Sequence, residues 1–326
     1  MKASIIIPCR NMAGFVGDTV ASVLSQSHGD LELIFVDDLS TDGSGDVVRA
    51  IKDSRVTILQ GKGNGPGGAF NVGLAHATGD IVMKCDADDL YPQNRLAFQV
   101  HFLERHPDVA AVSGYMSFVW TDLSPILECR RRGAREMPLN DDLLNGRFPD
   151  HVCAYAYRTS VLRKLGGIRE YFQSSEDLDL LARLGEQYPV WHVDQHAYVN
   201  RLHDASLTRT TSTASLKWFI ARTLEFQKQR RTRGQDDLQL GQAPPVPSDF
   251  PKTLRRSAAQ AAAELLEGDS WGRFEQGDWT GAIHAASRAV WYRPFDTGTL
   301  KNLAAITAKS LLRSLIGKPP EGAIQS

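Results

Sequence analysis

One acidic pair in this 326-residue chain follows an apolar run and could bind a cation. Asp86 and Asp88, separated by Ala87, come directly after the apolar run 81–84. In an extended segment two such side chains project the same way. Their charges repel unless a cation neutralises them, and Mg²⁺ or Mn²⁺ typically binds one or two carboxylates together with substrate phosphates. The alternative is a solvated acidic turn, because so short a pattern is common by chance.

Two other acidic pairs are candidate functional residues. Asp37-Asp38 follows the run 31–36, and Glu176-Asp177 stands at the start of a helical pattern. Asp177 could serve as a general base, which typically accelerates a reaction by ~10²–10⁴-fold. The alternative is an acid that interacts favourably with the dipole of its own helix. His203 is read either as a ligand or as a surface histidine, and both readings stay open.

Strands and helices alternate around these carboxylates. Short β-branched apolar runs predict buried strands, and apolar residues at helical spacing predict the helices between them; the strands are 4–8, 31–36, 55–60 and 81–84, the helices 16–26, 44–51 and 69–77. Such alternation is typical of a doubly wound, Rossmann-like α/β fold with a mostly parallel sheet. Ligands of open sheets bind beyond the carboxyl ends of the strands, which is where both aspartate pairs stand.

Three further segments complete the organisation. Residues 61–68 hold five glycines and one proline, so we expect a loop; it lacks the endings of known phosphate-binding loops. Residues 122–148 show no clear pattern. From 214 to 326 the chain reads as a helical extension, whose tryptophans indicate either a packing cap or a dimer contact. Its amphipathic last helix with flanking lysines leaves docking on a membrane surface as the functional alternative.

Charge and cysteine usage exclude several classes of protein. The net charge is −1, from 37 basic and 38 acidic residues, so nothing favours nucleic acid as a partner. The four cysteines include no CxxC pair, which argues against a zinc site or a disulfide framework. No signal peptide and no run of ~18 apolar residues is evident. We therefore expect a cytoplasmic protein, with peripheral contact at the inner membrane face left open.

Four sequence blocks, taken together in this order and spacing, resemble the family 2 inverting nucleotide-sugar glycosyltransferases of the GT-A fold. They are the first strand with Pro8-Cys9-Arg10-Asn11, the VDD segment at 36–38, the segment 68–89 that ends in the DxD of Asp86 and Asp88, and the Glu176-Asp177 pair. The resemblance covers roughly residues 3–212. It implies a GT-A domain over 1–213, with a nucleotide-sugar half of about 1–100 and an acceptor half of about 101–213, followed by the all-α extension 214–326.

The resemblance also implies roles for individual residues. Asp38 matches the residue that hydrogen-bonds the base, usually uracil, and Asp37 would buttress it. Asp177 matches the general base. Asp86, Asp88 and His203 would hold the metal, residues 201–208 resemble the family's closing loop, and His151 would lie on the acceptor side. Donor binding is implied for Pro8, Arg10, Asn11, Asp37, Asp38, Asn71, Asp86, Ala87, Asp88, Glu176 and Arg201.

The expected protein is thus a metal-dependent inverting glycosyltransferase. Its metal would be Mn²⁺ or Mg²⁺, and the favoured donor is a UDP-sugar. Its acceptor would be a carbohydrate, a lipid-linked glycan or a small molecule, and a homodimer through the helical extension is open. A sugar nucleotidyltransferase and a non-catalytic sugar-nucleotide-binding scaffold are the alternatives. One departure concerns the base: Phe70 stands where the family commonly has arginine.

Overall fold

The computed structural model describes residues 1–130, 135–206, 212–251 and 256–316, with the backbone alone at 314–316. By its internal contacts the chain divides into two compact units. The first comprises Met1–Val119, Glu128–Arg201 and Thr210–Thr253, and the second comprises Trp120–Leu127, Leu202–Arg209 and Leu254–Ser326. The expected boundary at 213/214 differs from this division, which groups the described residues 212–251 with the first unit.

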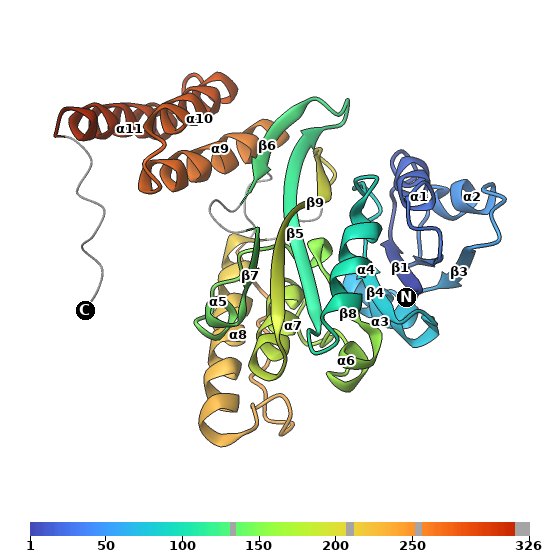
Figure 1. The fold of residues 1–326 in the computed structure, drawn as a ribbon. Helices are drawn as coiled ribbons and strands as arrows, with labels where there is room; N and C mark the ends of the chain where they lie inside the picture. Colours follow the sequence, from blue (N-terminus) through green and yellow to red (C-terminus); the bar gives the residue numbers. More distant parts are fainter. Residues whose placement is uncertain (131–134, 207–211, 252–255, 317–326) are drawn as a thin grey trace. The chain divides into compact units, whose positions relative to one another are not determined.

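The N-terminal half of the first unit alternates strand and helix as expected (Figure 1). Its elements are β1 (Ala3–Cys9), α1 (Val16–Leu24), β2 (Leu31–Asp37), α2 (Ser44–Arg49), β3 (Val56–Gln60), α3 (Gly65–His76) and β4 (Ile81–Lys84). Helix α3 begins inside the glycine-rich segment that we expected to be a loop up to residue 68. Pro66 lies in its first turn, where the missing N–H of proline costs no hydrogen bond.

The following elements complete the first unit and reach into the second. They are α4 (Arg95–Arg105), β5 (Ala111–Trp120), β6 (Pro125–Cys129), β7 (Glu136–Pro138), α5 (Asn140–Leu144), the 3₁₀ turn η1 (Val152–Ala154), β8 (Ala156–Arg158), α6 (Thr159–Lys164), α7 (Glu176–Gln187), β9 (Val190–Leu202) and α8 (Thr213–Arg233). The expectation that residues 122–148 are irregular was wrong, because β6, β7 and α5 lie there. Strands this short carry too few alternating positions to be recognised.

One mixed sheet of nine strands organises the fold, in the order β3-β2-β1-β4-β8-β5-β9-β7, with β6 paired to β5. Strands β3, β2, β1 and β4 are parallel, as predicted. Strand β8 pairs antiparallel with both β4 and β5. The register aligns Cys9 of β1 with Asp37 of β2, and Ile6 of β1 with Lys84 of β4. The acidic pairs therefore follow the carboxyl ends of parallel strands at one edge of the sheet.

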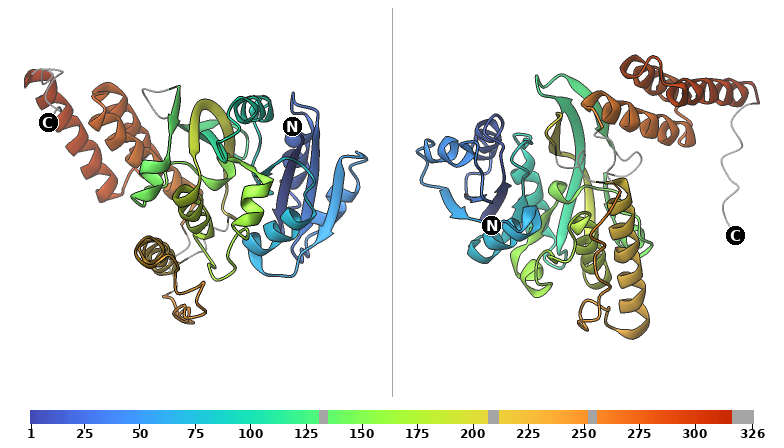
Figure 2. Two further views of the ribbon diagram at one scale, coloured as in Figure 1. Left: turned by 60° about the horizontal axis from the view of Figure 1, so that its bottom comes forward. Right: turned by 180° about the vertical axis from the view of Figure 1, so that it is seen from behind.

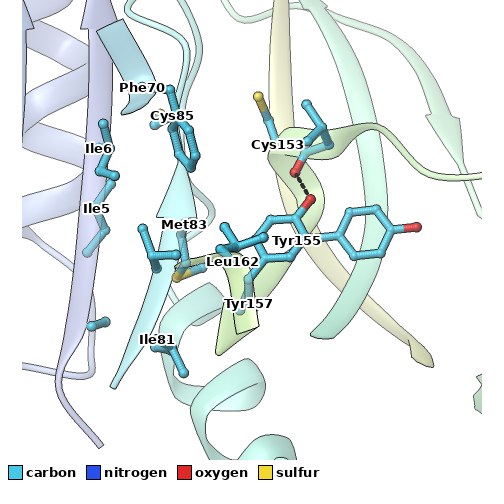
Figure 3. Packing of buried hydrophobic residues seen from close by; sticks show 14 of the residues in the cluster. Ile5, Ile6, Phe70, Ile81, Met83, Cys85, Cys153, Tyr155, Tyr157 and Leu162 are labelled. Atoms are coloured by element: carbon cyan, nitrogen blue, oxygen red, sulfur yellow. Dashed lines mark hydrogen bonds between the residues drawn. The ribbon is translucent and has the colours of Figure 1, made fainter. Parts of the chain in front are cut away.

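The main core lies between the sheet and its helices. Ile5, Ile6 and Met83 of the parallel strands are fully buried, and Figure 3 shows them in one cluster of buried residues with Phe70 and Cys85. Phe70, 1% exposed, is thus a core residue that packs beside β4. An arginine at this position would place an unpaired charge in the core, which explains why this chain has an apolar residue there.

A buried ion-pair network joins α8 to α7. Asp179 of α7 is fully buried and pairs with Arg169 and Arg183. Arg169 also contacts Asp236, 2.8 Å away, and Asp236 in turn pairs with Arg230 of α8. Breaking a buried pair leaves an uncompensated charge, so such a network fixes its elements strongly. This is the physical reason why α8 belongs to the first unit rather than to the helical extension.

The second unit contains three helices that pack on one another, drawn in orange to red in Figure 2: α9 (Ala258–Glu275), α10 (Trp279–Tyr292) and α11 (Thr297–Ile316). Their contact is made through small residues of α10, Ala282 and Ala286, against Ile306 and Trp271. Serine and aspartate caps at Ser257 and Asp278 begin α9 and α10. None of the helices in the described part of the chain is both long and apolar enough to cross a membrane.

Candidate active site

Asp38 is enclosed by the glycine-rich segment before α3. Its carboxylate, 2% exposed as a residue, accepts hydrogen bonds from the backbone N–H groups of Gly63 (2.7 Å) and Gly65 (3.0 Å). A Cβ at Gly61 would come within 2.4 Å of Asp38 Oδ1, so only glycine allows this approach. The segment 61–65 and Asp38 therefore form one unit at the end of β2, beside the predicted nucleotide site.

The loop after β1 is fixed to the loop after β2. Asn11 has a φ of 58°, in the left-handed region, and its side-chain oxygen accepts from the N–H of Thr41 at 2.8 Å. Asp37 holds the same loop, because its carboxylate accepts from the N–H of Ser40 at 2.9 Å. Pro8 is buried, and Arg10 is exposed. Of the predicted donor-binding residues here, Arg10 and Asn11 are the ones that a ligand at the surface can reach.

Asp86 lies in a tight turn, not in the extended segment that we expected, since Asp89 N–H donates to the carbonyl of Asp86 at 3.1 Å. Its carboxylate is held from both sides. The Lys84 ammonium donates to one oxygen, and the Cys153 thiol lies 3.4 Å from the other. The backbone N–H of Asp86 donates to Tyr198 of β9 at 3.0 Å. Burial alone would raise the pKa of Asp86, but the charges of Lys84 and His151 and the hydrogen bonds from Lys84 and Cys153 together outweigh it, so the pKa is lowered.

His151 joins this cluster from the loop before η1. One potential ligand atom from each of Asp86, His151 and Cys153 lies within 4.8 Å of the others. The His151 ring accepts from the N–H of Cys153 at 3.3 Å and stacks at 6.1 Å on Tyr198. The predicted acceptor-side histidine therefore lies against the DxD turn, although the sequence separates the two by many residues.

The second half of the turn is organised by Arg201. This side chain, 2% exposed, donates to the carbonyl of Asp88, to Phe15 O at 3.1 Å and to Asp18 at 3.1 Å. Its backbone N–H donates to Asp89 at 2.8 Å. The guanidinium thus ties the turn to α1. In this arrangement Arg201 positions Asp88, and its predicted contact with the donor stays a prediction.

Asn71 has both polar ends of its side chain in use. Its amide nitrogen donates to the carbonyl of Ile168 at 2.7 Å, and its oxygen accepts from the N–H of Ile168 at 2.9 Å. Gly167 leaves the room for this contact, since a Cβ there would lie 2.4 Å from Asn71 Oδ1. The residue predicted to bind the donor therefore fastens α3 to the loop after α6 in the structure.

Glu176 and Asp177 begin α7 after a strained residue. Ser175 has a φ of 57°, which is uncommon for a side chain other than glycine and often marks a functional site. Burial raises the pKa of Glu176 to about 7, and the charge of Asp177 adds to this, while Lys84 opposes it. Glu176 lies within electrostatic range of Lys84 and Asp86, so the start of α7 lies near the DxD turn. Asp177 Oδ1 accepts from the N–H of Leu178 at 3.0 Å.

His203 accepts, through its ring, a hydrogen bond from the N–H of Ala205 at 3.2 Å. It is 6% exposed and belongs to the segment that groups with the second unit. Its proposed role as a metal or diphosphate ligand stays a prediction. The family's closing loop was expected over 201–208, and residues 207–208 lie outside the described part of the chain.

A hard divalent cation fits the carboxylates of this site. Asp86 and Asp88 provide the oxygen ligands that Mg²⁺ and Mn²⁺ prefer. Lys84 already supplies one positive charge to Asp86, so a cation here would meet a partly neutralised pair.

Sequence reasoning missed three residues of the site: Lys84, Cys153 and Tyr198. A signal was available for Lys84, because it lies two positions before Asp86 at the end of a strand and residues so spaced share a face. Cys153 reaches the turn from η1 and Tyr198 reaches it from β9. No local sequence pattern predicts these two contacts.

Comparisons with known proteins give the family of the chain. A family model described as glycosyl transferase family 2 matches residues 4–166. The putative glycosyltransferase EpsE of Bacillus subtilis is 30% identical over 241 residues, which cover 71% of this chain and 83% of that protein. An uncharacterized glycosyltransferase of Nostoc sp. is 33% identical over 51% of this chain, and the chain spans only 53% of that relative.

Solved structures share the fold. S. aureus TarS 1-349 in complex with UDP has a TM-score of 0.55 at 18% identity, covering 96% of this chain and 92% of that one. Its complex with UDP-GlcNAc has a TM-score of 0.58 at 19% identity, covering 95% and 88%. The expected GT-A fold with C-terminal helices is thereby confirmed. The chain belongs to glycosyl transferase family 2, a family of transferase enzymes.

Proposed function

We propose that this protein is a metal-dependent inverting glycosyltransferase that moves a sugar from a nucleotide diphosphate sugar to an acceptor hydroxyl. The observation that carries the proposal is the assembly at one edge of the sheet. There Lys84 donates a hydrogen bond to Asp86 and lies within electrostatic range of Glu176 at the start of α7. A nucleotidyltransferase or a binding scaffold has no need of the acidic pair that opens α7.

The acceptor hydroxyl is activated by Asp177 in this proposal. Its carboxylate takes the proton of the hydroxyl while the acceptor oxygen forms a bond to the anomeric carbon. The bond from that carbon to the diphosphate oxygen breaks, and its electron pair leaves with the diphosphate. Attack from the face opposite the leaving group inverts the anomeric centre, as in one-step glycoside hydrolysis. The anomeric configuration of the product, read by NMR, tests this step.

Asp86 and Asp88 would hold the divalent cation, with His203 as a third candidate. When bound, such a cation stabilises the charge that develops on the leaving diphosphate. Lys84 and Arg201 keep the two carboxylates in place for it, the first through Asp86 and the second through the carbonyl of Asp88.

For the donor we propose a UDP-sugar. Asp38 stands at the end of β2, where the family's base-binding acid is expected, and TarS of similar fold binds UDP and UDP-GlcNAc. For the acceptor we propose a saccharide on a lipid diphosphate. A relative from Escherichia coli, 35% identical over 34% of this chain, is named for glucosyl transfer from UDP-Glc to GlcNAc-diphosphoundecaprenol. A cytoplasmic location and a homodimer through the helical extension stay predictions.

A thermal-shift screen of nucleotide diphosphates and nucleotide sugars, with and without Mn²⁺, tests the proposal. Ligands that bind only the folded state raise the unfolding midpoint by mass action. We expect UDP and one UDP-sugar to raise it, and to do so more with Mn²⁺. If GDP raised the unfolding midpoint and UDP did not, the proposed UDP-sugar donor would be wrong. If no nucleotide raised it, with or without metal, the proposed glycosyltransferase function would be wrong.

A further inference from the structure

The turn between α10 and α11 exposes large aromatic side chains. Trp291, in the last turn of α10, is 76% exposed, and Phe295, between the two helices, is 93% exposed. Leu300, in the first turn of α11, is 42% exposed. We call residues 288–301 the α10–α11 tip. Single exposed apolar residues need no explanation, but several in one turn mark an interaction site.

The tip is held in shape by its own hydrogen bonds. Asp296 accepts from the N–H and the hydroxyl of Thr299, at 2.8 and 3.0 Å, and pairs with Arg293 at 2.6 Å. Tyr292 is fixed by Trp120, whose indole N–H donates to the Tyr292 hydroxyl at 3.3 Å. The neighbours of Trp291 and Phe295 are therefore engaged within the second unit, while these two aromatic rings face solvent.

Charge is unevenly distributed over the three helices. Between residues 279 and 316 there are five basic residues against one acid: Arg288, Arg293, Lys301, Lys309 and Arg313 against Asp296. Helix α9 has the opposite balance, with four acids against one base: Glu264, Glu267, Asp269 and Glu275 against Arg273. The chain as a whole carries a net charge of only −1. The exposed aromatic residues thus belong to the positively charged part of the second unit.

We propose that the α10–α11 tip docks the protein on the surface of an anionic lipid bilayer. Tryptophan and phenylalanine at the boundary of headgroups and acyl chains, with Lys and Arg toward anionic headgroups, form the usual combination of an interfacial anchor. A second copy of the chain fits less well, because two tips facing each other would bring like charges together. Anionic lipid complements both the apolar and the basic side chains.

Co-sedimentation of the full chain with vesicles tests this surface. We expect binding to vesicles of phosphatidylcholine and phosphatidylglycerol in equal amounts, little binding to phosphatidylcholine alone, and release by added salt. The double variant Trp291→Ser/Phe295→Ser should bind the mixed vesicles at least about tenfold more weakly. Leu240→Ser, which removes a 43% exposed leucine from the first unit, is the matched control and should bind like the wild type.

Two results would overturn the proposal. In one, the wild type does not bind the mixed vesicles, or the double variant binds them as tightly. In the other, the double variant changes the molar mass measured by light scattering and leaves vesicle binding unaltered, which would make the tip a contact between copies. Unchanged thermal unfolding of the variant shows that it is folded. Since the assay contains neither donor nor acceptor, its outcome is independent of the proposed transferase reaction.

Discussion

The ammonium of Lys84 donates a hydrogen bond to the carboxylate of Asp86, the first acid of the DxD turn. Burial by itself lowers the pKa of Lys84, but the charge and hydrogen bond of Asp86, together with the smaller effects of Cys153 and Glu176, outweigh it, and the pKa lies well above its ordinary value. Lys84 is therefore a buried cation, with a side chain 6% exposed. Glu176 also lies within electrostatic range of Lys84, although its effect is smaller than that of Asp86. The positive charge of Lys84 therefore acts on carboxylates of two segments.

Replacing Lys84 by methionine should lower the free energy of unfolding by about 1–3 kcal/mol. Removing one partner of a buried pair leaves the other charge uncompensated, and the loss stays below that of a fully buried pair because the Asp86 side chain is 31% exposed. Urea denaturation measures the difference. Lys62→Met, at an exposed lysine of the same unit, is the control and should change stability by less than about 0.5 kcal/mol.

A double-mutant cycle separates this pairing from simple loss of packing. If the ion pair is the cause, Lys84→Met combined with Asp86→Asn should destabilise less than the sum of the single changes. Strict additivity would show that Lys84 and Asp86 act independently.

The stability of the protein should fall as the pH rises through about 7, because of Glu176. Burial and the neighbouring Asp177 raise its pKa from 4.5 to about 7. Between these values the folded state binds more protons than the unfolded state, so the free energy of unfolding decreases with rising pH. The contribution of the raised Glu176 pKa to the free energy of unfolding is fully present below about pH 4.5 and lost above about pH 7.

Glu176→Gln should flatten this dependence, as measured by urea denaturation from about pH 5 to about pH 8. A glutamine keeps the shape of the side chain and removes the proton equilibrium. An equal slope in the variant and the wild type would show that another group titrates.

Much of this arrangement could be predicted from sequence, because strand ends fix where side chains go. Asp37-Asp38 and Asp86 follow apolar runs, and the parallel register brings those runs to one edge of the sheet. The identity of the fold and the position of the DxD turn depend only on such local patterns. The start of α7 was visible in the same way, as an acidic pair before a helical pattern.

Contacts between distant side chains could not be predicted. The pairing of Asn71 with Ile168, and of Asp86 with Cys153, joins residues whose sequence neighbourhoods carry no trace of one another. The boundary of the helical extension differed for the same reason. Helices α7 and α8 are joined by a series of ion pairs that runs from Asp179 through Arg169 and Asp236 to Arg230. From sequence, such residues look like ordinary charges of solvated helices.

Asp88→Asn should weaken Mn²⁺ binding at least about tenfold, because the cation loses an anionic oxygen ligand. Titration calorimetry of Mn²⁺ in the presence of UDP measures this without turnover. Asp46→Asn, which removes an exposed carboxylate from α2, should leave Mn²⁺ binding as in the wild type. Equal Mn²⁺ affinities of the Asp88→Asn variant and the wild type would show that Asp88 is not a metal ligand.

Asp177→Asn should abolish most transfer while the donor still binds. The amide keeps the size of the side chain but cannot take the proton of the acceptor hydroxyl, so kcat should drop by about 10²–10⁴-fold. Asp177 is not among the residues that enclose the proposed nucleotide site around Asp38, so the rise in unfolding midpoint given by UDP and Mn²⁺ should match that of the wild type. Full activity in the variant would assign the base to another carboxylate, and Glu176, adjacent in the chain and with a pKa of about 7, would then be the group to test.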